Sequence, residues 1–172
     1  FNASLQMGFT MADELGVPRP RAFSQRDESG LTRATLPLLV ANNISIISLG
    51  SGAPLFSMPD LFVWRDEATD SQVLFAYDHG YGGGTHILPN GHALYCSWNT
   101  DNGGPKSEAS ITGTLKQLRS RYKNAKVFSS TFDAFADAAK QSNALGSLPV
   151  VTSEIGDTWL YGVPSDPLKN VH

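Results

Sequence analysis

Cysteine and charged residues are scarce in this chain, and long apolar runs are missing from it. The 172 residues include one cysteine, Cys96, which excludes an internal disulfide and a zinc site built from several cysteines. Charged residues make up 17% of the sequence, and 13 Lys plus Arg against 16 Asp plus Glu give a net charge of -3. This balance excludes a nucleic-acid-binding protein that relies on a basic surface. No apolar run approaches the roughly 18 residues of a membrane-spanning helix, so a membrane protein is excluded as well.

The rest of the composition is typical of a globular domain. Hydrophobic residues make up 41% of the chain and aromatic residues 10%, which is too much apolar surface for a disordered protein. A chain of this length can bury roughly 70% of its unfolded surface. We therefore expect residues 1–172 to form a single domain.

Helices and strands are predicted to alternate along the chain. Apolar spacing predicts helices over residues 3–15, 30–41 (with a kink at Pro37), 107–122 and after a cap at 129–131. Extended or strand segments are predicted at residues 21–25, 44–49, 61–64, 72–77, 92–98, 126–128 and 148–152. Strands that alternate with helices indicate βα units. The sequence therefore predicts an α/β fold with a mainly parallel sheet.

Carboxylate side chains follow four of the predicted strands. They are Asp27, Asp78, Asp101 and Asp157. A single carboxylate in this position is more often a helix cap or a turn former, but four of them together favour a site. Because loops converge at the carboxyl ends of parallel strands, we expect all four to open on one side of the sheet.

Aromatic residues accompany these carboxylates, and this mixture suits a carbohydrate site. Acids can act on the glycosidic bond, and flat rings can stack on the apolar faces of sugars. Asp157, Trp159 and Tyr161 alternate on an extended stretch, which places them on one face. The candidate substrate-binding residues are Arg26, Trp64, Asp78, His79, Asn102, Asp157, Trp159 and Tyr161.

Simpler roles compete with substrate binding at several of these positions. Arg26 can serve as the ion-pair partner of a neighbouring carboxylate, and His79 as a hydrogen-bonded loop histidine. His86 and His92 flank a predicted hairpin turn, where we expect solvated side chains rather than metal ligands.

Four segments share their order with segments of a known enzyme family. Residues 26–33 (Arg-Asp-Glu-Ser-Gly-Leu-Thr-Arg) precede a predicted helix and strand, with Asp27 and Gly30 as the matching positions. The other three segments are residues 62–67, 99–105 and 152–157. In this order the chain resembles class II alpha-mannosidases, which are zinc-dependent retaining glycoside hydrolases, and it looks like an uncharacterised branch related to them.

The resemblance implies a fold, an activity and a cofactor. The fold would be part of a (β/α)7 barrel, so that the chain is an internal fragment of a larger barrel domain. The activity would be retaining hydrolysis of alpha-mannoside-type bonds, with Asp27 as nucleophile and zinc ligand and Asp101 as acid. Zinc would orient the sugar hydroxyls and polarise the site.

The chain departs from the family at positions that matter for this chemistry. No His-x-Asp zinc pair precedes Asp27, and the last zinc histidine of the family falls on Tyr161 or Leu160. Asn102 occupies the position of the family's acid/base aspartate, which would leave that role to Asp101. One carboxylate does not hold zinc, so the zinc site that the resemblance implies is incomplete in this chain.

Three functions therefore remain open. The first is a glycoside hydrolase, and the second is an inactive carbohydrate-binding protein, which Asn102 and Tyr161 favour. The third is a structural or partner-binding part of a larger assembly. The chain begins at Phe1 without a charged-then-apolar signal, so we expect it to be processed or cut from a longer polypeptide. The sequons Asn2-Ala3-Ser4 and Asn43-Ile44-Ser45 predict a secreted glycoprotein.

Overall fold

The computed structural model describes residues 1–26, 30–51, 57–80, 83–99 and 103–155, and the statements below concern these residues. In chain order the elements are α1 (Asn2–Glu14), β1 (Ala22–Arg26), the 3-10 helix η1 (Arg33–Thr35), α2 (Leu36–Ala41), β2 (Ile46–Ser51), β3 (Leu61–Asp66), β4 (Ser71–His79), β5 (Thr85–Ile87), β6 (Ala93–Tyr95), α3 (Glu108–Arg121), α4 (Phe132–Gln141), the 3-10 helix η2 (Ala144–Ser147) and β7 (Val150–Val151).

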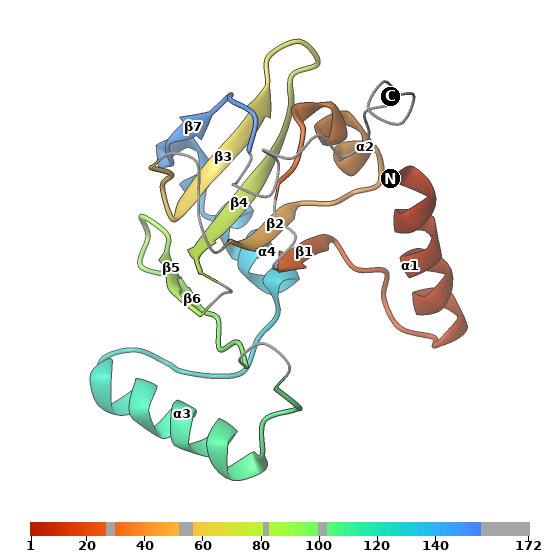
Figure 1. Cartoon of the computed structure of the whole chain (residues 1–172). Coiled ribbons are helices and arrows are strands. Elements are labelled where there is room, and N and C mark those ends of the chain that lie inside the picture. Colours follow the sequence, from red (N-terminus) through yellow and green to blue (C-terminus); the bar gives the residue numbers. More distant parts are fainter. Residues whose placement is uncertain (27–29, 52–56, 81–82, 100–102, 156–172) are drawn as a thin grey trace, which may run out of the picture.

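The main sheet has five strands in the order β1-β2-β4-β3-β7, and β5 and β6 form a separate two-stranded sheet (Figure 1). β1, β2 and β4 are parallel, β3 is antiparallel to β4, and β7 is parallel to β3. The expected α/β class and the mostly parallel pairing are thus confirmed. In the described part of the chain this sheet is open, with β1 and β7 at its edges, and no closed barrel is seen.

Helices cover both faces of the sheet, which explains the continuous apolar runs of its central strands. Alternate residues of β4 enter two separate cores. Phe75 belongs to the core on the side of α1 and α2, where it stacks on Phe62 at 4.8 Å between ring centroids. Leu74 and Ala76 belong to the core on the side of α4.

Most of the predicted helices form with the expected bounds. The prediction for residues 3–15 matches α1, and the prediction for 107–122 matches α3. The predicted cap at 129–131 is also confirmed, because the Thr131 hydroxyl accepts a hydrogen bond from the Ala134 amide at the start of α4.

Two local predictions differ from the structure, and a third element is predicted correctly but is not buried. Residues 30–41 form η1 and α2 in place of one kinked helix. Pro37 lies in the first turn of α2, where its missing N–H needs no partner, so it starts a helix and does not bend one. Residues 126–128 form no strand. The apolar residues of α3 remain unburied among the described residues, and α3 lies apart from both sheets (Figure 1).

The directions of the strands decide which residues share an edge. β1, β2 and β4 end at the same edge, where Arg26 aligns with Gly50 and Gly50 with Asp78. β7 runs the opposite way. Trp64 pairs with both Val73 and Val151, so β7 lies across β3 from the amino-terminal part of β4.

The expectation of one shared carboxyl edge is therefore wrong for two strands. β7 precedes Asp157 in the sequence but runs against β4, because the β3–β4 hairpin reverses direction and β7 follows β3. β6 precedes Asp101 but belongs to the small sheet. Asp157 and Asp101 themselves lie outside the described residues.

Candidate functional site

The carboxyl edge of β1, β2 and β4 holds a buried ion pair between Arg26 and Asp78. Both side chains lie on the α4 face of the sheet, because they align across β2 and alternate with residues of the other core. Arg26 Nη2 lies 3.3 Å from Asp78 Oδ2, and the two side chains are 9% and 2% exposed. Arg26 also donates to the Ser48 carbonyl (2.8 Å) and hydroxyl (2.7 Å) of β2. The guanidinium is therefore fixed by three strands at once.

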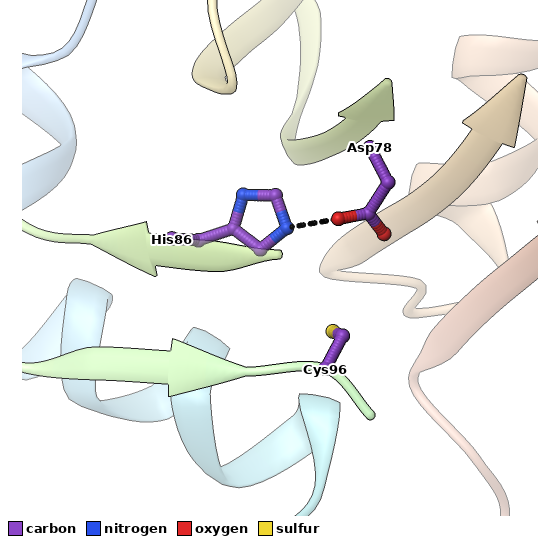
Figure 2. A group of neighbouring side chains, drawn as sticks. All are labelled: Asp78, His86 and Cys96. Carbon is purple, nitrogen blue, oxygen red and sulfur yellow. Dashed lines mark hydrogen bonds and ion pairs between the residues drawn. The ribbon is translucent and has the colours of Figure 1, made fainter. Parts of the chain in front are cut away.

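His86 of β5 approaches the same carboxylate from the other side. Its Nε2 lies 3.0 Å from Asp78 Oδ1 (Figure 2). Its Nδ1 lies 2.9 Å from the backbone oxygen of Asp60. Both partners are acceptors, so both ring nitrogens carry protons and the ring is an imidazolium. Burial by itself lowers the pKa of His86. The hydrogen bonds and charges of Asp78 and Cys96 outweigh burial and raise this pKa to about 9.

Cys96 completes a group of three side chains with different donor atoms. It directly follows β6, and its amide donates to the Gly84 carbonyl at 2.9 Å. The donor atoms of Asp78, His86 and Cys96 all lie within 4.8 Å of one another. Figure 2 shows the three side chains converging from β4, β5 and the end of β6. We call this group the Asp-His-Cys cluster.

Gly84 explains how the chain folds back on the cluster. A Cβ atom at this position would lie 2.8 Å from Asp78 Oδ1, closer than real Cβ contacts allow, so the carboxylate occupies the space that a side chain would need. Gly80 and Gly83 on the same connection have φ of +96° and +112°, in the region that favours glycine. Gly80, Gly83 and Gly84 therefore allow β5 to lie close to the end of β4.

An open pocket of about 240 Å³ lies beside the cluster, and Arg26, Cys96 and Trp98 line it together with residues at the start of α4. The Arg26 guanidinium carbon lies 5.5 Å from the centroid of the Trp98 ring, a cation–π distance. Trp98 is 48% exposed, which leaves part of its ring open to a ligand. Asp78 and His86 lie behind these residues and are buried.

Of the candidate residues expected at this edge, the structure brings Arg26 and Asp78 together. Arg26 has the ion-pair role that competed with substrate binding. Asp78 is 3% exposed and is engaged by both Arg26 and His86, so its carboxylate supports the site from inside and does not face the pocket.

Trp64 and His79 lie elsewhere. The expectation that Trp64 binds substrate is wrong, because its ring is fully buried in the core and its indole N–H donates to the Ser153 carbonyl at 2.9 Å. His79 is exposed. Its Nε2 lies 3.1 Å from Asp60 Oδ1, and its ring contacts Tyr77 edge-on, which agrees with a hydrogen-bonded loop histidine.

The other predicted site residues lie outside the described residues, and their roles remain predictions. They are Asp27, Asp101, Asn102, Asp157, Trp159 and Tyr161.

Sequence reasoning missed His86 and Cys96 as site residues, and it counted Trp98 only among the aromatic residues that accompany the carboxylates. The expectation of a solvated His86 is wrong, since the residue is 2% exposed, whereas the neighbouring Ile87 is 59% exposed. Only the structure shows this inversion of polarity on β5, because alternation in the sequence does not tell which face of a short strand is covered.

Comparison with known proteins adds no family to this picture. No family model, curated protein or solved structure matches the chain. Among the described residues, no helix has the length and apolar character needed to cross a membrane.

Proposed function

We propose that this chain acts on carbohydrates as a retaining glycoside hydrolase, with its site at the carboxyl edge of β1, β2 and β4. The observation that carries the proposal is the position of Arg26. It ends β1 beside an open pocket lined by Trp98, and it directly precedes Asp27 in the segment that resembles the mannosidase nucleophile segment.

The contacts of Arg26 support a role in positioning. Because its guanidinium is held by Ser48 and Asp78, the end of β1 has a fixed place relative to the pocket. Holding a reacting group in place lowers the entropy cost of reaching the transition state. Arg26 directly precedes Asp27 in the sequence, so a fixed Arg26 would serve the proposed nucleophile.

The pocket offers aromatic surface for a sugar. Trp98 and Tyr95 are 48% and 44% exposed and line the pocket together with Phe132. Trp98 therefore takes the stacking role that the sequence suggested for Trp64. In the proposed reaction Asp27 attacks the anomeric carbon, and Asp101 protonates the leaving oxygen.

Zinc, which the resemblance implies, would polarise sugar hydroxyls when bound. The described residues whose donor atoms suit zinc are Asp78, His86 and Cys96. They differ from the histidine and aspartate ligands that the resemblance implies.

Release of a chromogenic alpha-mannoside tests the hydrolase. We expect Asp27→Asn to abolish turnover, because the amide cannot form the covalent intermediate. We expect Asn102→Asp to raise it, because this change restores the acid of the family. All proteins are assayed with and without added zinc. Undiminished turnover in Asp27→Asn would contradict the proposed nucleophile.

A second candidate is a carbohydrate-binding protein without hydrolytic activity. The observation that favours it is that the pocket presents aromatic rings, while the nearby Asp78 carboxylate is buried and fully engaged. A glycan-binding screen would distinguish the two, with Trp98→Ala expected to lose binding. The matched control is Phe128→Ala, which removes an aromatic ring that is 64% exposed and does not line the pocket. Absence of turnover with Trp98-dependent binding would support this second candidate.

A further inference from the structure

We propose that Asp78, His86 and Cys96 form a binding site for a divalent metal ion of the zinc type. One carboxylate oxygen, one imidazole nitrogen and one thiol sulfur lie within 4.8 Å of one another, and they come from three separate parts of the chain (Figure 2). Oxygen, nitrogen and sulfur donors in one group are the ligands that zinc accepts, and three protein ligands leave a fourth tetrahedral position open. The inference depends on the described side chains alone and not on the proposed hydrolase.

Contacts outside the three donor atoms already orient them. Metal-binding histidines usually donate their second ring N–H to a backbone carbonyl or a carboxylate, and His86 Nδ1 lies 2.9 Å from the Asp60 carbonyl. This contact directs Nε2 toward Asp78. Ligating carboxylates are likewise held through their other oxygen, as Arg26 holds Asp78 Oδ2 at 3.3 Å.

The distance between the histidine and carboxylate ligand atoms requires only a small adjustment to admit an ion. With bonds of about 2.0–2.1 Å to nitrogen and oxygen, tetrahedral geometry separates the two ligand atoms by about 3.3 Å. His86 Nε2 and Asp78 Oδ1 are 3.0 Å apart, so they need to separate by only about 0.3 Å. With a bond of about 2.3 Å to sulfur, the Cys96 sulfur would lie about 3.5 Å from Nε2.

The charge of the cluster is also compatible with a cation. The Asp78 carboxylate, whose Oδ1 lies 3.0 Å from His86 Nε2, brings one negative charge to the cluster. A divalent ion takes the place of any proton on Nε2 and binds sulfur as the thiolate, and the displaced protons leave to solvent.

Cys96 and Arg26 line the open pocket of about 240 Å³ described above, so an ion can enter from the side of the thiol. Asp78 and His86 are buried behind it, which shields the bound ion from bulk water on the opposite side. The fourth coordination position then faces the pocket, where water or a ligand oxygen can bind.

Cobalt(II) titration provides the direct test, because a thiolate bound to cobalt gives a charge-transfer absorption that oxygen and nitrogen ligands alone do not. We expect the unsubstituted chain to develop this absorption with one equivalent of cobalt and to lose it when zinc is added. Cys96 is the chain's single cysteine, so the band can arise from this residue alone.

Matched substitutions locate the ligands. Cys96→Ser should abolish the charge-transfer band. Loss of this ligand should also weaken zinc binding by more than the roughly 10–100-fold that is typical when a residue hydrogen-bonded to a ligand is changed. His86→Gln should weaken binding to a similar extent. The controls are His79→Gln and His92→Gln, which change exposed histidines outside the cluster and should bind as the unsubstituted chain does.

One further measurement needs no substitution and therefore no assumption about the folding of a variant. Zinc should slow the alkylation of Cys96 by iodoacetamide. The alkylation rate should fall as zinc fills the site and should recover when a chelator removes the zinc. Absence of the cobalt band in the unsubstituted chain, or unchanged zinc affinity in folded Cys96→Ser, would overturn the proposal. Neither readout involves sugar hydrolysis, so failure of the hydrolase would leave this result intact.

Discussion

Removing the Asp78 carboxylate should destabilise this fold strongly. In the metal-free protein, Asp78 is the shared anion of two buried cations, the Arg26 guanidinium at 3.3 Å and the His86 imidazolium at 3.0 Å. Asp78→Asn keeps the shape of the side chain but removes its charge. Breaking a buried ion pair by removing one partner typically costs about 3–5 kcal/mol, because the remaining charge stays buried without compensation. Since His86 can lose its proton in the variant, we expect a loss toward the lower end, about 3 kcal/mol.

Urea unfolding of the metal-free protein at pH 7 measures this loss. The matched control is Asp13→Asn, which breaks the Arg19–Asp13 pair, whose side chains are 58% and 51% exposed. Water screens that pair, so its removal should have a much smaller effect. Equal losses in Asp78→Asn and Asp13→Asn would refute the argument from burial.

A double-mutant cycle with Arg26→Gln separates the coupling from the other effects of each substitution. Because Arg26 keeps its bonds to Ser48 but loses its anion in the Asp78→Asn background, Arg26→Gln should cost less there than in the unsubstituted chain. Equal costs in both backgrounds would show that the two charges do not interact.

Three further changes test other parts of the argument. Gly84→Ala should destabilise the fold by roughly 1–3 kcal/mol, because its Cβ would lie 2.8 Å from Asp78 Oδ1. In the control Gly113→Ala, within α3, the added Cβ meets nothing within 4 Å, so this change should be neutral or stabilising. Urea unfolding measures both variants, and a stabilised Gly84→Ala together with a destabilised Gly113→Ala would contradict the steric reason. Trp64→Ala should cost about 3–5 kcal/mol because the ring is fully buried, and a loss below about 1 kcal/mol in thermal or urea unfolding would contradict its place in the core. The pKa of His86 is about 9 in the folded state against about 6.5 when unfolded. In the metal-free protein its contribution to the free energy of unfolding is therefore complete below pH 6.5 and is lost as the pH rises through 9. The difference corresponds to roughly 3 kcal/mol, and urea unfolding at several pH values should show a decline that His86→Gln lacks.

Much of the local structure could be predicted because it depends on residues that are close in sequence. Apolar spacing was sufficient for α1 and α4, and the β-branched apolar run was sufficient for β2. The apolar runs at residues 61–64 and 72–77 likewise predicted two strands, which form β3 and β4. The apolar spacing of α3 also predicted a helix correctly. It gave no information about burial, and in the structure no residue of α3 is buried.

The direction and neighbours of each strand could not be predicted in this way. The alternation of strands and helices predicted a mainly parallel sheet with one shared carboxyl edge, but the β3–β4 hairpin reverses the chain and β7 then pairs with β3. The carboxyl end of β7 therefore lies away from Arg26 and Asp78. The substrate-binding role predicted for Trp64 was wrong for a related reason. Whether a side chain of a central strand is buried depends on what covers the sheet and not on the strand itself.

The sequence by itself determined that Arg26 and Asp78 lie at the carboxyl ends of strands, since they directly follow the predicted segments 21–25 and 72–77. Only the tertiary structure decided that they meet, because β2 aligns the two strand ends in one register. His86 and Cys96 join them because the glycine-rich connection folds β5 and β6 back onto this edge. Such convergence depends on contacts between residues far apart along the chain, and periodicity within a short window carries no information about them.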